Sequence, residues 1–139
     1  MLACWLSRTS FLLFTTCLFF GCGRGDGPAL GLVTGKVTID DAPLAKAVIT
    51  YIPEQSGGSV SYGVTNAEGM YTMQFTTDKA GAVIGKHQVT IEPGSASFSD
   101  DGKPLPGSVK IPGKYRKPGT LSADVKAGPN VVDFALQSK

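Results

Sequence analysis

The sequence predicts an all-β fold in which two antiparallel sheets pack face to face. Three observations support this fold class. Apolar residues recur at every second position in several short runs, which is the period of a half-buried strand. The 139 residues include 18 Gly and 9 Pro, enough for frequent turns between these runs. Each run carries a single apolar face, so the faces must be buried against one another.

About seven strands are expected along the chain. Each is a short run with β-branched or aromatic residues at alternating positions, bounded by Gly, Pro, Asn or Asp. The runs lie at residues 33–39, 46–53, 60–65, 71–75, 86–93, 121–125 and 132–136. Two hairpins are predicted. A turn that begins at Asn66 joins the third and fourth runs, and a Gly-Pro-Asn turn that begins at Gly128 joins the last two.

Residues 94–120 show no sustained apolar alternation and are rich in proline, so they are expected to form a long surface loop. A loop of this length in a compact domain is the first place to look for a site. Positive charges gather in it, and an aromatic residue among them is expected to face outward. The candidate binding residues are Lys110, Lys114, Tyr115, Arg116 and Lys117. They would suit an anionic polysaccharide or a phosphate-bearing lipid, although a solvated loop explains the same charges.

Residues 1–21 have the organisation of a secretory signal. A single cation, Arg8, precedes an apolar stretch that is shorter than the ~20 residues needed to span a bilayer as a helix. The other two cysteines lie in this segment, so Cys22 would be the sole thiol of the exported chain. An unpaired Cys is unusual in an oxidising compartment, and attachment of a lipid such as palmitate would explain it. Gly21 before this Cys resembles the bacterial lipoprotein signal, although the two preceding Phe residues depart from it.

Two ways of processing the N-terminus stay open. Either a lipid is attached at Cys22, or the signal is cleaved after Gly23 and the exported protein is soluble. In both cases the Gly-rich residues 22–31 are expected to form a flexible tether, and the folded domain is expected over residues 32–139. The tripeptide at residues 24–26 spells the motif that animal adhesion receptors bind, and it is interpreted as a chance occurrence in this tether.

Several motifs of the folded region resemble those of a known family. They are VTGKVTIDDAPLAKAVITYIPE, GVTNAEGMYTMQF and AVIGKHQVTI. They are similar to the carboxypeptidase regulatory-like domain, a β-sandwich of the transthyretin-like or immunoglobulin-like kind. Asn66 replaces the family's usual Asp, and His87 stands where an aromatic residue is common. Residues 111–136 also resemble the C-terminal part of small exported bacterial lipoproteins that carry this domain, so the resemblance implies a fold and an envelope location rather than an activity.

Composition and residue types argue against several activities. The formal net charge of +2 provides no concentrated basic face, so nucleic acid is not an expected partner. His87 is the sole histidine and shares a strand face with Val89 and Ile91, so it is interpreted as a packed residue rather than a metal ligand or catalytic base. The Asp pairs at residues 40–41 and 100–101 lack the spacing of a Ca²⁺ loop and are interpreted as turn residues. No enzymatic activity, cofactor or metal is expected.

The sequence therefore predicts a non-catalytic protein that is anchored by lipid to the bacterial cell envelope, on its periplasmic or outer-surface side. The β-sandwich would serve as a structural or interaction module. The membrane is the expected partner through the lipid, together with a protein or glycan of the envelope. The alternative is a soluble exported domain that binds a glycan or another polymer through residues 94–120.

Overall fold

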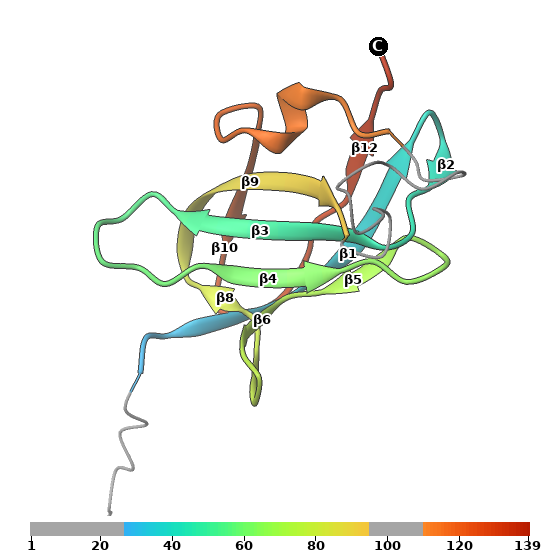
Figure 1. Cartoon of the computed structure of the whole chain (residues 1–139). Coiled ribbons are helices and arrows are strands. Elements are labelled where there is room, and N and C mark those ends of the chain that lie inside the picture. The colour runs from blue at the N-terminus through green and yellow to red at the C-terminus, as the bar shows by residue number, and fades with distance from the viewer. Residues whose placement is uncertain (1–26, 95–109) are drawn as a thin grey trace, which may run out of the picture.

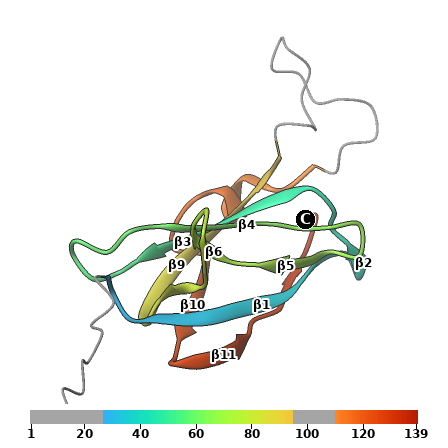
Figure 2. The same cartoon turned by 90° about the horizontal axis from the view of Figure 1, so that it is seen from below.

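The computed structural model describes residues 27–94 and 110–139, and the fold is given for these residues alone. Two sheets pack against each other (Figures 1 and 2). One layer contains β1 (Leu30–Ile39) and β11 (Gly128–Val131), and the other contains β3 (Ala47–Pro53) and β4 (Ser61–Val64). The predicted all-β class with two packed sheets is confirmed, and most strand pairs are antiparallel, although the first sheet also contains two parallel pairs. Within the described ranges, the one helical element is the short 3₁₀ helix η2 (Gly113–Arg116). The predicted signal, Cys22, residues 24–26 and the Asp pair at 100–101 lie outside the described residues.

The first sheet is built around β1 (Leu30–Ile39), which has pairing partners on both of its edges. Three short strands pair with β1 in the antiparallel sense: β2 (Ala42–Pro43), β5 (Met70–Thr72) and β8 (Ala82–Val83). Two strands on the opposite edge pair with it in parallel: β11 (Gly128–Val131) and β12 (Phe134–Leu136). Residues of β1 alternate between a buried inner face and a more exposed outer face, as its sequence pattern predicts.

The second sheet is antiparallel in all the pairings that the described residues make. Its strand order is β10-β9-β3-β4-β6-β7. The strands are β3 (Ala47–Pro53), β4 (Ser61–Val64), β6 (Gln74–Thr76), β7 (Lys79–Ala80), β9 (Gly85–Pro93) and β10 (Leu121–Val125). The pairing of β3 with β9 runs along the whole of β3, from Ala47 opposite Pro93 to Pro53 opposite His87.

The predicted hairpin at Asn66 is confirmed in part, since β4 pairs with β6 in the antiparallel sense, whereas the predicted terminal hairpin is wrong. The last two predicted strands do not pair with each other, because β10 pairs with β9 in the second sheet while β11 and β12 pair with β1 in the first. The predicted strand at residues 71–75 is also divided between the sheets, since β5 pairs with β1 and β6 with β4. Apolar alternation reports which face of a strand is buried, and it does not report which strand lies beside it.

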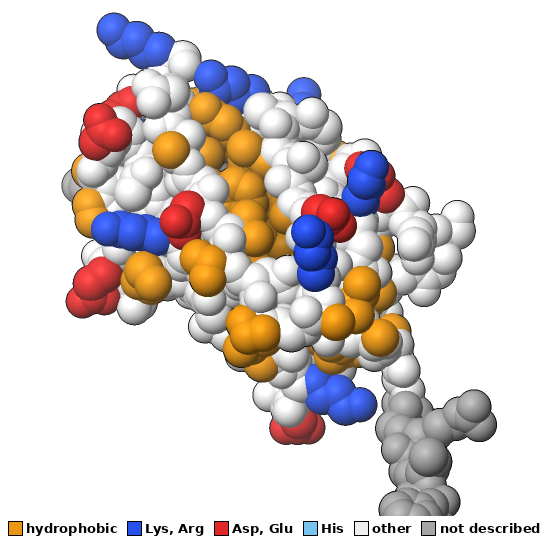
Figure 3. Space-filling view, turned by 180° about the vertical axis from the view of Figure 1, so that it is seen from behind, with side chains coloured by type: hydrophobic (Ala, Val, Ile, Leu, Met, Phe, Trp, Pro, Cys, Tyr) orange, Lys and Arg blue, Asp and Glu red, His pale blue; other side chains and the backbone are white. Residues whose placement is uncertain are grey.

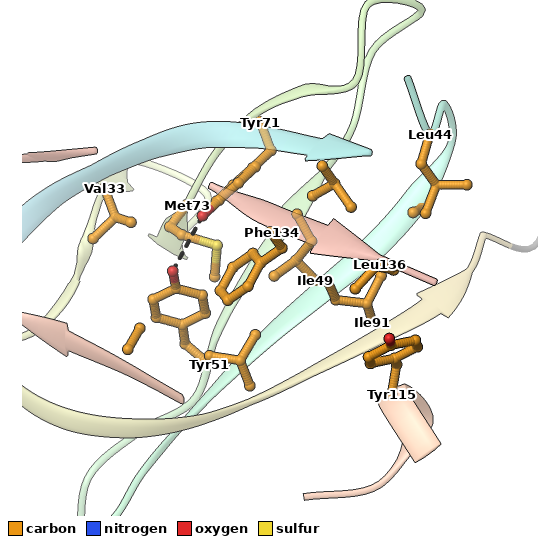
Figure 4. Packing of buried hydrophobic residues seen from close by; sticks show 14 of the residues in the cluster. Val33, Leu44, Ile49, Tyr51, Tyr71, Met73, Ile91, Tyr115, Phe134 and Leu136 are labelled. Atoms are coloured by element: carbon orange, nitrogen blue, oxygen red, sulfur yellow. Dashed lines mark hydrogen bonds between the residues drawn. The ribbon is translucent and has the colours of Figure 1, made fainter. Parts of the chain in front are cut away.

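The core lies between the two sheets and takes alternate residues from both (Figure 4). Tyr51 on β3 and Tyr71 on β5 come from opposite sheets, and their hydroxyl oxygens are 3.1 Å apart. The Tyr71 hydroxyl donates to the carbonyl of Val132 at 2.6 Å, so the Tyr51 hydroxyl is the donor between the two tyrosines. This chain of hydrogen bonds gives both tyrosine hydroxyl groups a partner and joins the sheets.

Gly35 in β1 allows the segment around Val132 to approach β1 closely. A Cβ atom at Gly35 would collide with the backbone carbonyl of Val132. The amide of Val132 in turn donates to the carbonyl of Thr34 at 2.8 Å. A side chain at position 35 would therefore force the segment between β11 and β12 away from β1.

Candidate functional site

The five predicted binding residues lie in one short segment of the structure. Lys110 precedes η2, Lys114, Tyr115 and Arg116 lie within it, and Lys117 follows it. The three lysines and Arg116 are exposed to solvent, whereas Tyr115 is only 6% exposed. The expectation that Tyr115 faces outward is therefore wrong, and the segment presents charged side chains without an aromatic surface.

Tyr115 is buried because it attaches η2 to the core. Its side chain projects from the helix toward the cluster that contains Ile91 and Leu136 (Figure 4). Its hydroxyl oxygen accepts a hydrogen bond from the Gln137 amide at 3.1 Å. Lys114 lies on the outside of this contact, with Nζ 4.9 Å from the ring centroid of Tyr115 and 2.9 Å from the carbonyl oxygen of Lys139. A single helical turn carries no periodic apolar pattern, so the sequence did not identify this anchor.

His87 is packed inside the sandwich, as predicted. It is 1% exposed on β9, and its ring centroid lies 5.5 Å from that of Tyr51. Nδ1 is 3.0 Å from the carbonyl oxygen of Gly85 and, in the neutral tautomer that carries its proton there, donates to it. Nε2 is buried and has no hydrogen-bond partner among the described residues.

Burial lowers the pKa of His87, because the imidazolium form would lose its hydration inside the sandwich. Three weaker influences oppose this effect: the hydrogen bond to the carbonyl of Gly85 and the negative charges of Asp124 and Glu54. The side chain is therefore a neutral imidazole at neutral pH. Its free nitrogen is enclosed, which leaves it poorly placed to take a proton from a substrate in solution.

Two shallow hollows lie near the start of β9, and His87 lines the first of them. The first has a volume of about 210 Å³ and is lined by Pro28, Pro53 and by residues 55–58 and 83–87. The second has a volume of about 320 Å³ and is lined by Glu54, Lys86, Ser122, Ala123 and Asp124. Lys86 borders both hollows. Their volumes lie below or at the lower end of the range of about 300–1,000 Å³ that is usual for ligand pockets.

The two core tyrosines remain protonated at neutral pH. Burial raises the pKa of Tyr51 to about 12. Burial is also the largest cause that raises the pKa of Tyr71, with the charge and the hydrogen bond of Tyr51 adding to it. Both hydroxyl groups are therefore structural hydrogen-bond partners, and neither has the pKa of a general base that works near neutral pH.

The prediction of a turn at Asn130 is wrong, because this residue lies in β11, where it has a structural role that the sequence analysis did not identify. Its Nδ2 lies 3.1, 2.8 and 3.0 Å from the carbonyl oxygens of Leu32, Lys126 and Gly128, and its Oδ1 accepts the Lys126 amide at 2.9 Å. These contacts fix the point at which the chain crosses from β10 in the second sheet to β11 in the first. A Gly-Pro-Asn sequence after a strand signals a turn, and it does not reveal this crossing.

The fold and these side chains define a small all-β protein in which two sheets, antiparallel in most of their strand pairs, pack together. Comparison with protein-family models, with the curated proteins and with the solved structures finds no match to this chain. Across residues 27–94 and 110–139, no three or more His, Cys, Asp or Glu side chains are grouped so that they could hold a metal ion. In the same described ranges, no helix has the length and apolar character that crossing a membrane requires.

Proposed function

We propose that the protein is a non-catalytic lipoprotein of the bacterial cell envelope. Its β-sandwich serves as a structural or interaction module on the periplasmic or outer-surface side. The observation that carries this proposal is the short interval between Cys22 and the folded domain. Cys22 directly follows the apolar, signal-like run, and β1 begins at Leu30, the eighth residue after it. A lipid at Cys22 would therefore hold the sandwich close to a membrane.

The proposal includes the kind of domain: a carboxypeptidase regulatory-like, transthyretin-like sandwich of the type found in small exported bacterial lipoproteins. The support comes from the roles of the residues that carry the resemblance. Asn66 replaces the family's usual Asp, and its Oδ1 accepts the amides of Glu68 and Met70 at 3.0 and 2.9 Å, which an aspartate oxygen would also do. His87 packs on Tyr51, which suits a position where the family commonly has an aromatic residue.

The non-catalytic part of the proposal is supported by how the polar groups of the core are used. Tyr51 and Tyr71 form the hydrogen-bonded link between the sheets, and His87 is enclosed with its Nδ1 on a backbone carbonyl. A catalytic acid or base must reach the reacting group of a substrate or of a water molecule. These side chains instead stabilise the sandwich.

Metabolic labelling tests the anchor. The full-length chain is expressed in a bacterial host with an alkyne analogue of palmitate, as wild type, as Cys22→Ser and as Cys17→Ser. We expect the wild-type protein and the Cys17→Ser variant to carry the label and to fractionate with membranes, because residue 17 lies in the removed signal. Cys22→Ser should carry no label. Labelling that is absent from the wild type, or equal in wild type and Cys22→Ser, would contradict the anchor.

A soluble exported module that binds an anionic polymer is the second candidate. The observation that favours it is the presentation of Lys114 and Arg116 in η2, a helix that Tyr115 holds against the core. The test is a pull-down of envelope polysaccharide with the wild type, with the double variant Lys114→Gln/Arg116→Gln, and with Lys79→Gln on β7 as the matched control. This candidate requires binding that the double variant loses and the control keeps. Binding that all three proteins share, or binding absent from the wild type, would contradict it.

A further inference from the structure

The outer face of the first sheet carries exposed apolar side chains. Leu32, Met70 and Val131 are 43%, 45% and 76% exposed. The register of the strands brings their side chains to one surface, because residues that are paired across neighbouring strands project to the same side. The pairs are Leu32 with Pro129, Thr34 with both Val131 and Thr72, and Lys36 with Met70. The β1 outer face is defined here as Leu32, Lys36, Met70, Thr72, Pro129 and Val131.

This surface has little charge of its own. Lys36 is the charged member of the β1 outer face, and its backbone amide donates to the carboxylate of Asp133 at 2.8 Å. On the back of the molecule, hydrophobic side chains reach the surface in several places, with charged side chains spaced around them (Figure 3). Apolar patches of this kind usually mark a surface that meets a partner or a membrane.

We propose that the β1 outer face lies against the surface of the lipid bilayer to which the protein is anchored. This inference rests on the proposed function, since it requires the lipid at Cys22. The length of the connecting chain is the first argument. Leu30 is the eighth residue after Cys22, so covalent geometry limits that span to about 29 Å. The start of β1 therefore stays within that distance of the residue that carries the lipid.

The position of the patch is the second argument. The connecting chain enters the fold at the start of β1, and Leu32 lies two residues beyond that point. The anchored end of the chain and the apolar face therefore belong to the same strand. Because the anchor supplies a high effective concentration of membrane, even a weakly apolar face would stay in contact with it.

The outer face of the second sheet also exposes apolar residues on β4, among them Val64. Each face has an acid and a lysine: Asp133 lies beside Lys36 at the β1 outer face, and Glu92 and Lys86 lie on the outer face of the second sheet. Position therefore distinguishes the two faces, because the connecting chain enters the fold through β1. The long side chain of Lys36 can extend toward the phosphate groups of the headgroups.

Single introduced cysteines test this orientation. In the processed and acylated chain Cys22 is blocked and the other two cysteines have been removed with the signal, so an introduced thiol is the one reactive site. Val131→Cys probes the β1 outer face, and Val64→Cys, at a position 61% exposed, is the matched control on the opposite sheet. Each lipidated protein is labelled with a bimane fluorophore and bound to vesicles of three parts phosphatidylethanolamine to one part phosphatidylglycerol, with the acyl chains brominated.

We expect bromine to quench the Val131→Cys probe severalfold more strongly than the Val64→Cys probe. Adding Cys22→Ser to Val131→Cys should remove the quenching together with the anchor. Equal quenching at the two positions, in protein that carries the fatty acid and floats with the vesicles, would overturn this orientation and leave the anchor intact. Protein that neither carries the fatty acid nor floats would overturn the anchor itself. A third outcome would also overturn the membrane assignment. If the bimane at Val131→Cys is not quenched by brominated lipid, but the unlabelled thiol is shielded from maleimide in the native envelope, the β1 outer face is covered by a protein partner.

Discussion

Tyr71 is the residue that links the most distant parts of the core. Its hydroxyl group accepts from Tyr51 on the second sheet and donates to the carbonyl of Val132, next to the C-terminal strand. If that hydroxyl is removed, both partners lose a hydrogen bond in a part of the molecule from which water is largely excluded. The loss of a buried partner costs more than the net gain of an ordinary hydrogen bond, because the remaining group stays desolvated.

The substitution Tyr71→Phe is therefore expected to lower the free energy of unfolding by about 1–3 kcal/mol. Urea denaturation at neutral pH, followed by circular dichroism, measures this change. Tyr62→Phe is the matched control, because Tyr62 is exposed on β4, and it should change the free energy by less than about 0.5 kcal/mol. Equal effects at the two positions would show that the link between the sheets contributes nothing specific.

Two residues show how far single positions could be predicted. The burial of His87 was predictable because Val89 and Ile91 continue its alternation, and a strand places all three side chains on one face. The burial of Tyr115 was not predictable, because η2 is a single turn and its other three residues are Gly, Lys and Arg. Only the approach of β9 and of the C-terminal residues provides the environment in which that ring is buried.

At the scale of the elements, the turn from β1 to β2 has an unusual backbone. Ile39 pairs with Ala42, so Asp40 and Asp41 form a two-residue hairpin loop. Both have left-handed backbone angles, with φ of 48° and 66°. This is the geometry of a type I′ turn, which favours Asn or Asp followed by Gly. The turn predicted for this Asp pair is confirmed, and its second residue is not the one that the geometry prefers.

Replacing Asp41 with Gly should raise the free energy of unfolding by a few tenths to about 1 kcal/mol, because glycine adopts a positive φ without steric cost. The comparison is Asp40→Gly, which relieves similar strain but removes the carboxylate that accepts the Ser138 amide at 3.0 Å. Thermal and urea unfolding of both variants measure the difference. A loss of stability in Asp41→Gly would contradict this account of the turn.

The crossing from β10 to β11 depends on one side chain, that of Asn130. Asn130→Ala removes its contacts with three backbone carbonyls and one amide and should lower the free energy of unfolding by about 1–3 kcal/mol. Asn130→Asp keeps the oxygen that accepts the Lys126 amide but loses the donor, so its loss of stability should be of similar size or intermediate. Urea denaturation again measures both changes. An unchanged midpoint for Asn130→Ala would show that the crossing is held elsewhere.

For the whole molecule, His87 couples stability to pH. Burial lowers the pKa of His87 from the unfolded value of 6.5, so between the two pKa values the unfolded chain binds more protons than the folded protein. Stability is therefore unaffected by this residue above about pH 6.5 and decreases as the pH falls below that value. His87 is the sole histidine, so no other histidine contributes to the decrease in stability below about pH 6.5.

Urea midpoints measured at intervals between about pH 8 and 5 should fall on the acid side of about 6.5 in the wild type. His87→Phe keeps an aromatic ring in the position beside Tyr51 and removes the titrating group. Its midpoint should therefore change little over the same range. A decline of equal size in this variant would assign the pH dependence to other groups.

The sequence by itself determined the all-β class, the approximate positions of most strands and the face that each strand buries, because side-chain alternation is a local property of an extended chain. It also predicted the turn at the Asp pair and the packing of His87. Only the tertiary structure decided which strands are neighbours: β1 between β11 and β5, β10 beside β9, and the chain at residues 71–75 divided between two sheets. Pairing depends on contacts between residues far apart in the chain, which is also why the buried side of Tyr115 and the apolar β1 outer face emerge only once the sheets are assembled.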